Sequence, residues 1–220
     1  MVFRISEGLV AKVTVERQMI TESRTLPYLQ EHLPHFPVPR LHGVIRIGQY
    51  GLLFTPFVPG LDLKKAWPQL DDVQKRSIST QIDKLLIELR SLPFPPNTPL
   101  GGVDERRCKD TRRAVRSSTK PILDVSEFED FIFAGSKTVS SMYTRFLQSL
   151  MPASPTTAVF AHGDIRPATI MVRQDDGDEK GSASWTVVAI IDWESSGFYP
   201  EYWECVKMTN NLMPRDEDDW

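Results

Sequence analysis

Two acidic residues, Asp164 and Asp192, each follow a short apolar run with the character of a β-strand. The segment between the two runs, residues 175–184, is rich in turn-forming residues, so residues 170–172 and 185–191 are predicted to pair as a hairpin. Such a hairpin carries Asp192 back toward Asp164. The chain is therefore expected to fold so that two carboxylates face one cleft.

Two carboxylates in one cleft suit phosphoryl transfer. One orients a substrate hydroxyl and accepts its proton, while the other holds Mg²⁺ on the nucleotide phosphates. The alternative for any single Asp at the end of a strand is a local cap that binds backbone N–H groups and has no chemical role. The spacing of the pair and its flanking residues favour the chemical interpretation.

The residues around both carboxylates resemble the catalytic loop and the metal-binding loop of the aminoglycoside phosphotransferase family. The positions that match are His162, Gly163, Asp164, Pro167, Ile170, Asp192, Trp193 and Glu194. Residues 191–204, which read IDWESSGFYPEYWE, are similar to the fungal branch of that family in particular.

This resemblance implies a role for each site residue. Asp164 is expected to be the catalytic base, Asp192 a ligand of Mg²⁺, and His162 a structural support beneath the loop. Where the family has a metal-binding Asn, this chain has Thr169, whose shorter hydroxyl side chain is then the second metal ligand.

The N-terminal segment extends the resemblance. Residues 9–13 form a predicted strand that carries Lys12, and Glu22 follows in a predicted helix. In the kinase-like fold, such a Lys binds the nucleotide phosphates and pairs with a helix Glu. Taken alone, the two residues are also compatible with an edge-strand Lys in water and a solvated Glu. Pro27 removes one helical hydrogen bond and is expected to kink the helix.

The resemblance implies an α+β, bilobal protein kinase-like fold with a reduced antiparallel N-terminal lobe and a mainly helical C-terminal lobe. Residues 1–60 are expected to form a partial nucleotide-binding lobe and hinge, and residues 61–220 the large lobe with the catalytic and metal-binding loops. Only eleven residues precede Lys12, and the chain ends soon after Glu204. We therefore expect a chain truncated at both ends relative to the family.

Two further segments have helical periodicity. Residues 71–92 carry apolar residues at helical spacing and are predicted to form a core helix. A second helical stretch is predicted to begin at a capping box, Ser126 to Glu129, and to continue its apolar face to Leu150. Between them, residues 105–116 concentrate positive charge, as either a solvated surface or a contact for an acidic ligand.

The composition of the chain indicates which partners and which cellular location to expect. The net charge of −3, with both signs interspersed, gives no general attraction to nucleic acid or to anionic lipid. No apolar stretch approaches the roughly 18 residues of a membrane span. The two cysteines, Cys108 and Cys205, are expected to be free thiols in a cytoplasmic protein.

The leading hypothesis is ATP- and Mg²⁺-dependent phosphoryl transfer to a hydroxyl of a small molecule. The second is a non-catalytic, pseudokinase-like binding module or an incomplete gene product, supported by the short N-terminal segment, Thr169 and Pro27. A third, a metal-dependent phosphoesterase, needs several His ligands at one metal, whereas three of the four His residues cluster far upstream. Neither the acceptor nor the oligomeric state follows from the sequence.

Overall fold

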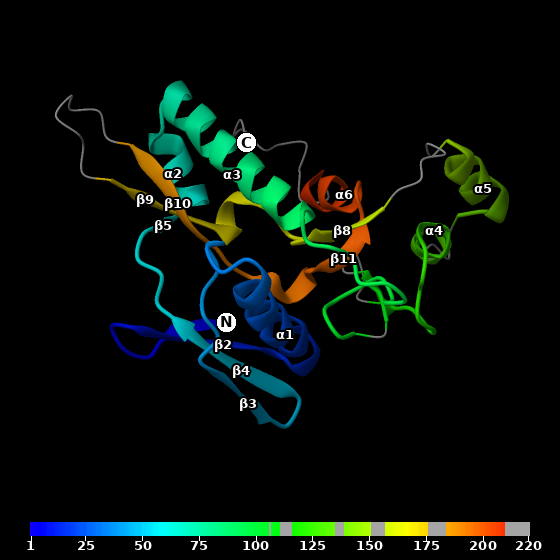
Figure 1. The fold of residues 1–220 in the computed structure, drawn as a ribbon, viewed down its shortest axis with the longest axis horizontal. Helices are drawn as coiled ribbons and strands as arrows, with labels where there is room; N and C mark the ends of the chain where they lie inside the picture. The colour runs from blue at the N-terminus through cyan, green and yellow to red at the C-terminus, as the bar shows by residue number, and fades with distance from the viewer. Residues whose placement is uncertain (106, 111–115, 135–138, 151–156, 176–183, 210–220) are drawn as a thin grey trace.

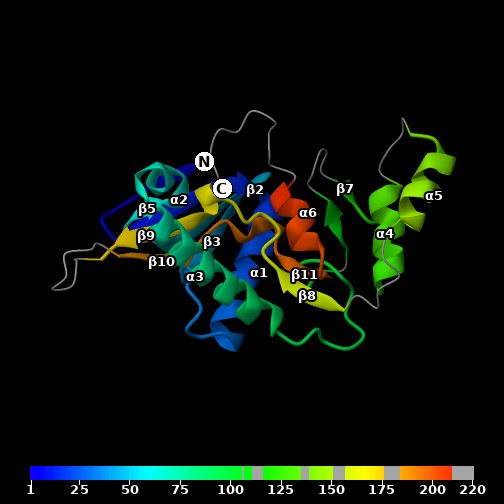
Figure 2. The same cartoon turned by 90° about the horizontal axis from the view of Figure 1, so that it is seen from above.

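The computed structural model describes residues 1–105, 107–110, 116–134, 139–150, 157–175 and 184–209. Figure 1 shows the N-terminal sheet and helix α1 on one side of the molecule and the remaining helices and strands on the other. Figure 2, seen from above, shows α4 and α5 at one end of the molecule, with β7 beside α4.

The N-terminal sheet is antiparallel, with four strands in the order β1-β2-β4-β3. Its strands are β1 (Val2–Arg4), β2 (Leu9–Val15), β3 (Gly43–Ile47) and β4 (Tyr50–Pro56). The strand predicted at residues 9–13 is confirmed as the main part of β2. Ala11 and Leu53 are both buried. Lys12 lies opposite Leu53 and shares its face of the sheet, whereas Ala11 lies on the other face.

Helix α1 (Glu16–His32) packs on this sheet and carries Glu22. Pro27 lies inside the helix and does not end it, because the helix continues to His32. Leu26 and Leu29 flank the proline and are almost fully buried, so core packing stabilises the turn that lacks a hydrogen bond.

The described residues of the C-terminal part form three small sheets and several helices. Its strands are β5 (Leu61–Asp62), β6 (Lys109–Asp110), β7 (Arg116–Ser117), β8 (Ala158–Ala161), β9 (Ile170–Gln174), β10 (Trp185–Ile190) and β11 (Gly197–Pro200). Its helices are α2 (Leu63–Ala66), η1 (Trp67–Gln69), α3 (Asp72–Arg90), α4 (Val125–Phe133), α5 (Ser141–Ser149), η2 (Pro167–Thr169), η3 (Trp193–Ser195) and α6 (Trp203–Thr209).

The hairpin predicted between the two acidic motifs is confirmed. β9 and β10 pair antiparallel, with Ile170 opposite Ile190 and Val172 opposite Val187. β10 ends two residues before Asp192, and the loop that carries Asp164 leads into β9 through η2. The hairpin therefore connects the two motifs in the way that brings their carboxylates to the same end.

The predicted core helix at residues 71–92 is confirmed as α3. Its start is a capping box, since the Asp71 carboxylate accepts from the backbone N–H of Gln74 while the Gln74 side chain accepts from the N–H of Asp71. Ile78, Ile82 and Leu89 are buried, and α3 packs against β8 and β10. This helix supports the strands that lead into both motifs.

The second predicted helical stretch is wrong in its details. Two helices, α4 and α5, cover its described part, and residues 135–138 of the prediction lie outside the described residues. Asp124, not Ser126, caps α4, because its carboxylate accepts from the N–H of Glu127. Phe128 is fully buried, but no described side chain of α5 is buried.

One large core joins the N-terminal and C-terminal parts. It contains Met19 and Leu53 from the N-terminal part together with Phe160, Ile170 and Trp193. A second, smaller core lies around Leu100, Cys108, Phe128, Tyr199 and Trp203. Both cysteines are free, as expected. Among the described residues, no helix is long and apolar enough to cross a membrane.

Candidate active site

Lys12 on β2 contacts three carboxylates from distant parts of the chain. Its Nζ lies 2.7 Å from Glu22 Oε2 and 2.9 Å from Glu194 Oε2, and it donates a hydrogen bond to Asp192 Oδ1. The structure thus brings together Lys12, Glu22 and Asp192, three of the residues selected from sequence. It adds Glu194, which matches the family pattern but was given no role.

The charged groups in this cluster shift the pKa values of one another. Burial opposes the charged form of Lys12, but Glu22, Asp192 and Glu194 outweigh it and raise the pKa of the ammonium group above its ordinary value. Burial also raises the pKa of Glu22 and of Glu194, with the charge of Asp192 as the next cause for Glu194. Burial opposes the charged form of Asp192, but the charge and the hydrogen bond of Lys12 outweigh it and lower the pKa of this carboxyl. Lys12 is therefore held as a cation.

Helix α1 holds the turn that presents Asp192. The second carboxylate oxygen of Glu22 accepts a hydrogen bond of 3.3 Å from the backbone N–H of Trp193, and Gln18 donates to Glu194 at 2.6 Å. Asp192 itself has a left-handed backbone, with φ 73° and ψ 55°. Such conformations are uncommon outside glycine and concentrate at functional sites, where surrounding contacts hold them.

Asp164, in the loop after β8, is linked to this cluster through Arg166. The Arg166 Nε lies 3.1 Å from Asp164 Oδ2, and its Nη2 lies 3.9 Å from Asp192 Oδ2. One guanidinium group thus lies beside both carboxylates. Arg166 was not selected from the sequence, although a basic residue two positions after a candidate catalytic Asp was a usable signal.

Glu204 on α6 holds the backbone of the catalytic loop. It is 4% exposed, and its carboxylate accepts from the N–H of His162 at 2.6 Å and from the N–H of Gly163 at 3.1 Å. Glu204 ends the family-like run of residues 191–204, but its position in the sequence did not indicate a role. No spacing rule signals this contact, because it joins residues 41 and 42 positions apart.

His162 supports the loop from below. Its Nδ1 accepts a hydrogen bond of 3.2 Å from the N–H of Asp164, so its Nε2 carries the proton and donates to the carbonyl of Ile191 at 3.0 Å. Burial lowers the pKa of His162. The neutral ring therefore joins the two motifs, in the supporting role that the resemblance implied.

Position 163 needs a glycine, because the loop that carries Asp164 packs closely against the turn that follows Asp192. Its φ is 76°, and a Cβ atom at this position would lie 2.5 Å from the carbonyl oxygen of Ser195. Glycine is the residue that adopts this backbone without strain and leaves that space open.

Thr169 lies inside the loop and is 2% exposed. Its Oγ1 lies 3.0 Å from the carbonyl oxygens of Asp164 and of Arg166, and it accepts from the N–H of Arg166 at 3.2 Å. In this arrangement the hydroxyl stabilises the loop backbone. The role of Thr169 as a metal ligand stays a prediction.

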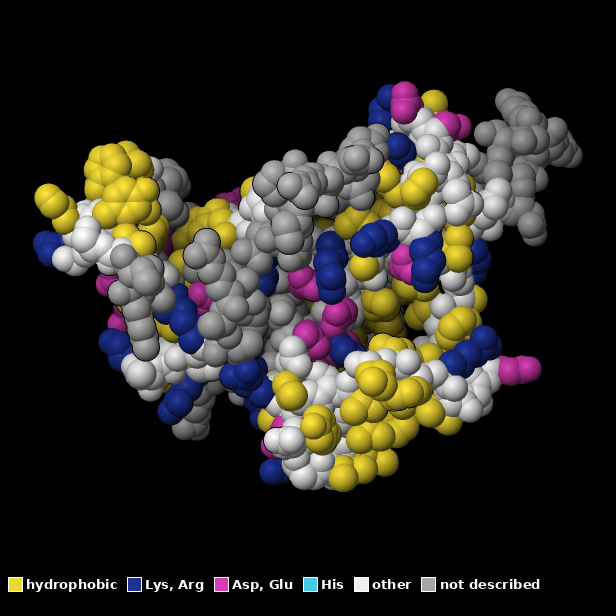
Figure 3. All heavy atoms as spheres, turned by 180° about the vertical axis from the view of Figure 1, so that it is seen from behind, with side chains coloured by type: hydrophobic (Ala, Val, Ile, Leu, Met, Phe, Trp, Pro, Cys, Tyr) yellow, Lys and Arg dark blue, Asp and Glu magenta, His cyan; other side chains and the backbone are white. Residues whose placement is uncertain are grey.

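The site has a donor set that suits a divalent cation. Carboxylate oxygens of Glu22, Asp192 and Glu194 lie within 4.8 Å of one another. Mg²⁺ prefers oxygen ligands, commonly one or two carboxylates together with phosphate oxygens. Figure 3 shows acidic side chains gathered where the molecule is hollowed at the centre of this face. The residues therefore fit Mg²⁺, with Asp192 and Glu194 as the more exposed pair.

A family model described as the phosphotransferase enzyme family (APH) matches residues 1–220. The chain belongs to this family. No curated protein matches the chain significantly.

Solved structures with the same fold include thermostable mutants of aminoglycoside phosphotransferase APH(4)-Ia. A ternary complex with ADP and hygromycin B is 14% identical, with a TM-score of 0.57, and the match covers 94% of this chain and 70% of that one. The apo form is 15% identical, with a TM-score of 0.56, and the match covers 92% of this chain and 64% of that one. A complex with AMP-PNP and hygromycin B is 15% identical, with a TM-score of 0.56 and coverages of 93% and 69%.

These matches confirm the protein kinase-like fold and the family predicted from the two motifs. This family member spans 64 to 70% of the length of those three chains. Its mixed helices and strands and its antiparallel N-terminal sheet agree with the predicted fold class.

Proposed function

We propose that this family member transfers the γ-phosphoryl group of ATP to a hydroxyl of a small molecule, in a reaction that requires Mg²⁺. The observation that carries the proposal is the contact of Lys12 with both Glu22 and Asp192, the latter 180 positions away in the chain. The fold adds support, because similar structures contain ADP or AMP-PNP together with hygromycin B.

In this proposal Lys12 binds the nucleotide phosphates and Glu22 orients it. A raised pKa keeps Lys12 cationic, as phosphate binding needs. Asp192, with Glu194 beside it, would hold Mg²⁺, which neutralises charge on the phosphates when it is bound. Thr169 is the second ligand implied by the family pattern, and its hydroxyl would have to exchange bonds to loop carbonyls for that role.

Asp164 is the proposed base. It would orient the acceptor hydroxyl and take its proton as the new oxygen–phosphorus bond forms. Arg166, beside Asp164 and Asp192, is placed to stabilise negative charge on the transferred group.

The proposal extends to organisation and location. Residues 1–60 are taken as the nucleotide-binding lobe and hinge, and residues 61–220 as the lobe that carries both loops. We propose a cytoplasmic location, where ATP is supplied, and no nucleic-acid or membrane partner.

Titration calorimetry with ATP, in the presence and absence of Mg²⁺, tests the nucleotide site. Asp192→Asn and Lys12→Met are each expected to weaken Mg²⁺-dependent binding about tenfold or more, because each removes a charge-assisted contact. The matched controls are Asp83→Asn and Lys84→Met, two exposed positions on α3, which should bind like the parent chain. Equal binding by all four variants contradicts the proposal.

Transfer itself is tested with a screen of hydroxyl-bearing small molecules, with labelled ATP as the donor. Asp164→Asn is expected to lower the rate of any transfer found by about 10² or more while leaving ATP binding intact. An unchanged rate would show that Asp164 is not the base.

A second candidate function is nucleotide binding without transfer. It is favoured by the bonding of the Thr169 hydroxyl within the loop, which leaves the metal without the family's amide ligand. Thr169→Asn separates the two candidates. A variant that gains transfer activity absent from the parent chain supports the binding module, and a parent chain that already transfers excludes it.

A further inference from the structure

A second hollow lies away from the Lys12 cluster, between helix α1 and the described residues 104–105, 107, 109 and 117. Its volume is about 620 Å³, within the range of small-molecule sites. The charged side chains that matter most for its chemistry are those of Arg17, Arg24, Asp104, Glu105, Arg107 and Lys109. We call this feature the arginine hollow.

The acidic residues of the arginine hollow are largely neutralised by lysine or arginine partners. Glu105 is paired with Lys109 at 2.6 Å, and Glu16, also in the lining, is paired with Arg46 at 2.8 Å. Arg46 is not part of the lining. Asp104 is the remaining lining carboxylate, and it is exposed.

The other charged groups of the lining are three guanidinium groups, those of Arg17, Arg24 and Arg107, and the single carboxylate of Asp104. Arg24 donates to the backbone carbonyl of Asp104 at 2.8 Å, which positions it without neutralising its charge. Among the residues that the structure describes, the guanidinium groups of Arg17 and Arg107 have no hydrogen-bond or ion-pair partner. The hollow therefore presents an excess of positive charge.

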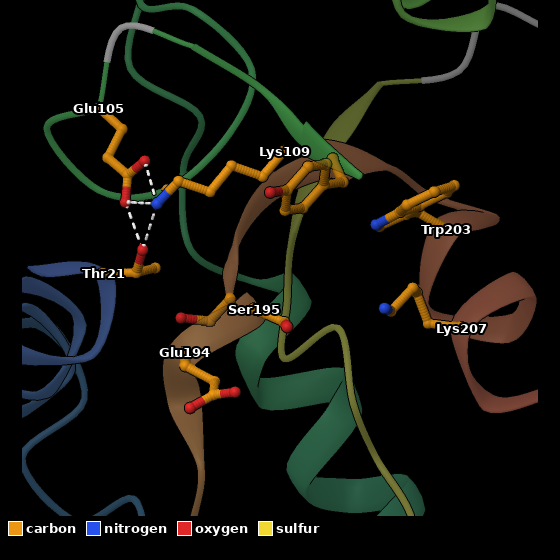
Figure 4. A pocket seen from close by; sticks show the side chains of 10 residues that line it. Thr21, Glu105, Lys109, Glu194, Ser195, Trp203 and Lys207 are labelled. Carbon is orange, nitrogen blue, oxygen red and sulfur yellow. Dashed lines mark hydrogen bonds and ion pairs between the residues drawn. The ribbon is translucent and has the colours of Figure 1, made fainter. Parts of the chain in front are cut away.

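Beside the arginines, Lys109 and Glu105 are held in place by hydrogen bonds with each other and with Thr21. Figure 4 shows the Lys109 ammonium group between Glu105 and Thr21. Lys109 Nζ lies 2.6 Å from Thr21 Oγ1, and Thr21 also donates to Glu105. Burial lowers the pKa of Lys109, and after the opposing effect of Glu105 the charges of Arg17 and Arg24 lower it further. The positive potential of the arginines thus acts at this wall.

We propose that the arginine hollow binds a small molecule carrying at least two phosphate or carboxylate groups. Guanidinium groups match both anions with paired N–H donors, and two of them here have no partner to give up on binding. The site is separate from the nucleotide site proposed above, because none of Lys12, Asp164 and Asp192 lines it.

Calorimetric titration of the chain with inorganic pyrophosphate and, separately, with citrate tests this site, with EDTA present to remove divalent metal. The two probes distinguish phosphate from carboxylate recognition. Arg17→Gln with Arg24→Gln is expected to weaken binding of the preferred probe about tenfold or more. The matched control, Lys84→Gln with Arg90→Gln on α3, removes the same charge at exposed positions and should bind like the parent chain.

Because pyrophosphate could also bind at Lys12, the Lys12→Met variant is titrated in parallel. Binding kept in Lys12→Met and lost in the Arg17 and Arg24 double variant supports the arginine hollow. Three results overturn the proposal. They are binding that is lost only in Lys12→Met, binding that is unchanged in the double variant, and no detectable binding of either probe to the parent chain. These outcomes are independent of Mg²⁺-dependent ATP binding, so the proposal can fail while the proposed function stands.

Discussion

The segment from β8 to α6, called here the active-site segment, and the α4–α5 segment both contain several aromatic residues, yet they bury them differently. Phe160, Trp193 and Phe198 are almost fully buried. In the α4–α5 segment Phe128 is fully buried, but Phe146 is 56% exposed.

The difference lies in the neighbouring elements. The active-site segment packs against α1 and α3, whereas α5 has few contacts beyond α4 among the described elements. A regular apolar pattern shows which face of a helix could be buried. Burial itself requires a second surface, and that surface determines the energy gained.

The largest expected loss of stability is at Phe128, the buried residue of the α4–α5 segment. Phe128→Ala should lower the free energy of unfolding by about 3–5 kcal/mol, because the ring packs edge-on against Trp203 and Tyr199 in the smaller core. Chemical denaturation measures this. A loss below about 1 kcal/mol would mean that α4 is as loosely packed as α5.

A smaller loss is expected from Glu204→Gln in the active-site segment. The change removes the charge that accepts from two buried N–H groups, and should cost about 1–3 kcal/mol. The exposed neighbour provides the control, since Glu201→Gln should leave stability unchanged. Amide NMR shifts of His162 and Gly163 should move only in the Glu204 variant. If they do not, the carboxylate does not hold the loop.

The third effect is a pH dependence that only the active-site segment should show. Burial lowers the pKa of His162, so the unfolded chain binds the proton first as the pH falls. Stability is retained above the ordinary His value, about pH 6.5, and decreases as the pH falls toward the lowered pKa. The slope from this group is at most about 1.4 kcal/mol per pH unit.

Unfolding curves between pH 7 and pH 5 check this for His162→Gln. The variant should lose that part of the slope, while His35→Gln, at an exposed position, should keep the parent slope. Equal slopes in all three chains would show that His162 is protonated as easily in the folded chain as in the unfolded chain.

The smallest effect is expected at the exposed end of the α4–α5 segment. Phe146→Ser should change the free energy of unfolding by no more than about 0.5 kcal/mol, because its ring remains largely in water in the folded chain. A loss comparable to that of Phe128→Ala would mean that α5 packs against another surface in solution.

The candidate site divides in the same way into residues that sequence indicated and residues that it did not. Lys12, Glu22, Asp164 and Asp192 follow from motif order, because each lies in a segment with its own local signal. Glu194 has a motif position but no predicted contact with Lys12. Glu204 could not be given its role, since its bonds to the catalytic loop depend on the packing of α6.

Predictions of local elements succeeded where the signal was also local. The hairpin between β9 and β10 follows from two apolar runs and a turn-rich link, and helix α3 follows from apolar residues at helical spacing. The predicted cap at Ser126 was wrong because the carboxylate of Asp124, two positions earlier, accepts the capping hydrogen bond instead. Adjacent capping residues compete, and small differences in backbone geometry select one.

By itself, the sequence determined the family, the fold class, the two acidic motifs and the strands that lead into them. The tertiary structure alone decided that Lys12 meets three carboxylates, that Arg166 lies beside both aspartates, and that three arginines surround a hollow beside α1. The physical reason is the distance along the chain over which each kind of signal acts. Turn, cap and alternation signals act over a few residues, whereas charge clusters and burial depend on surfaces that only the packed chain brings together.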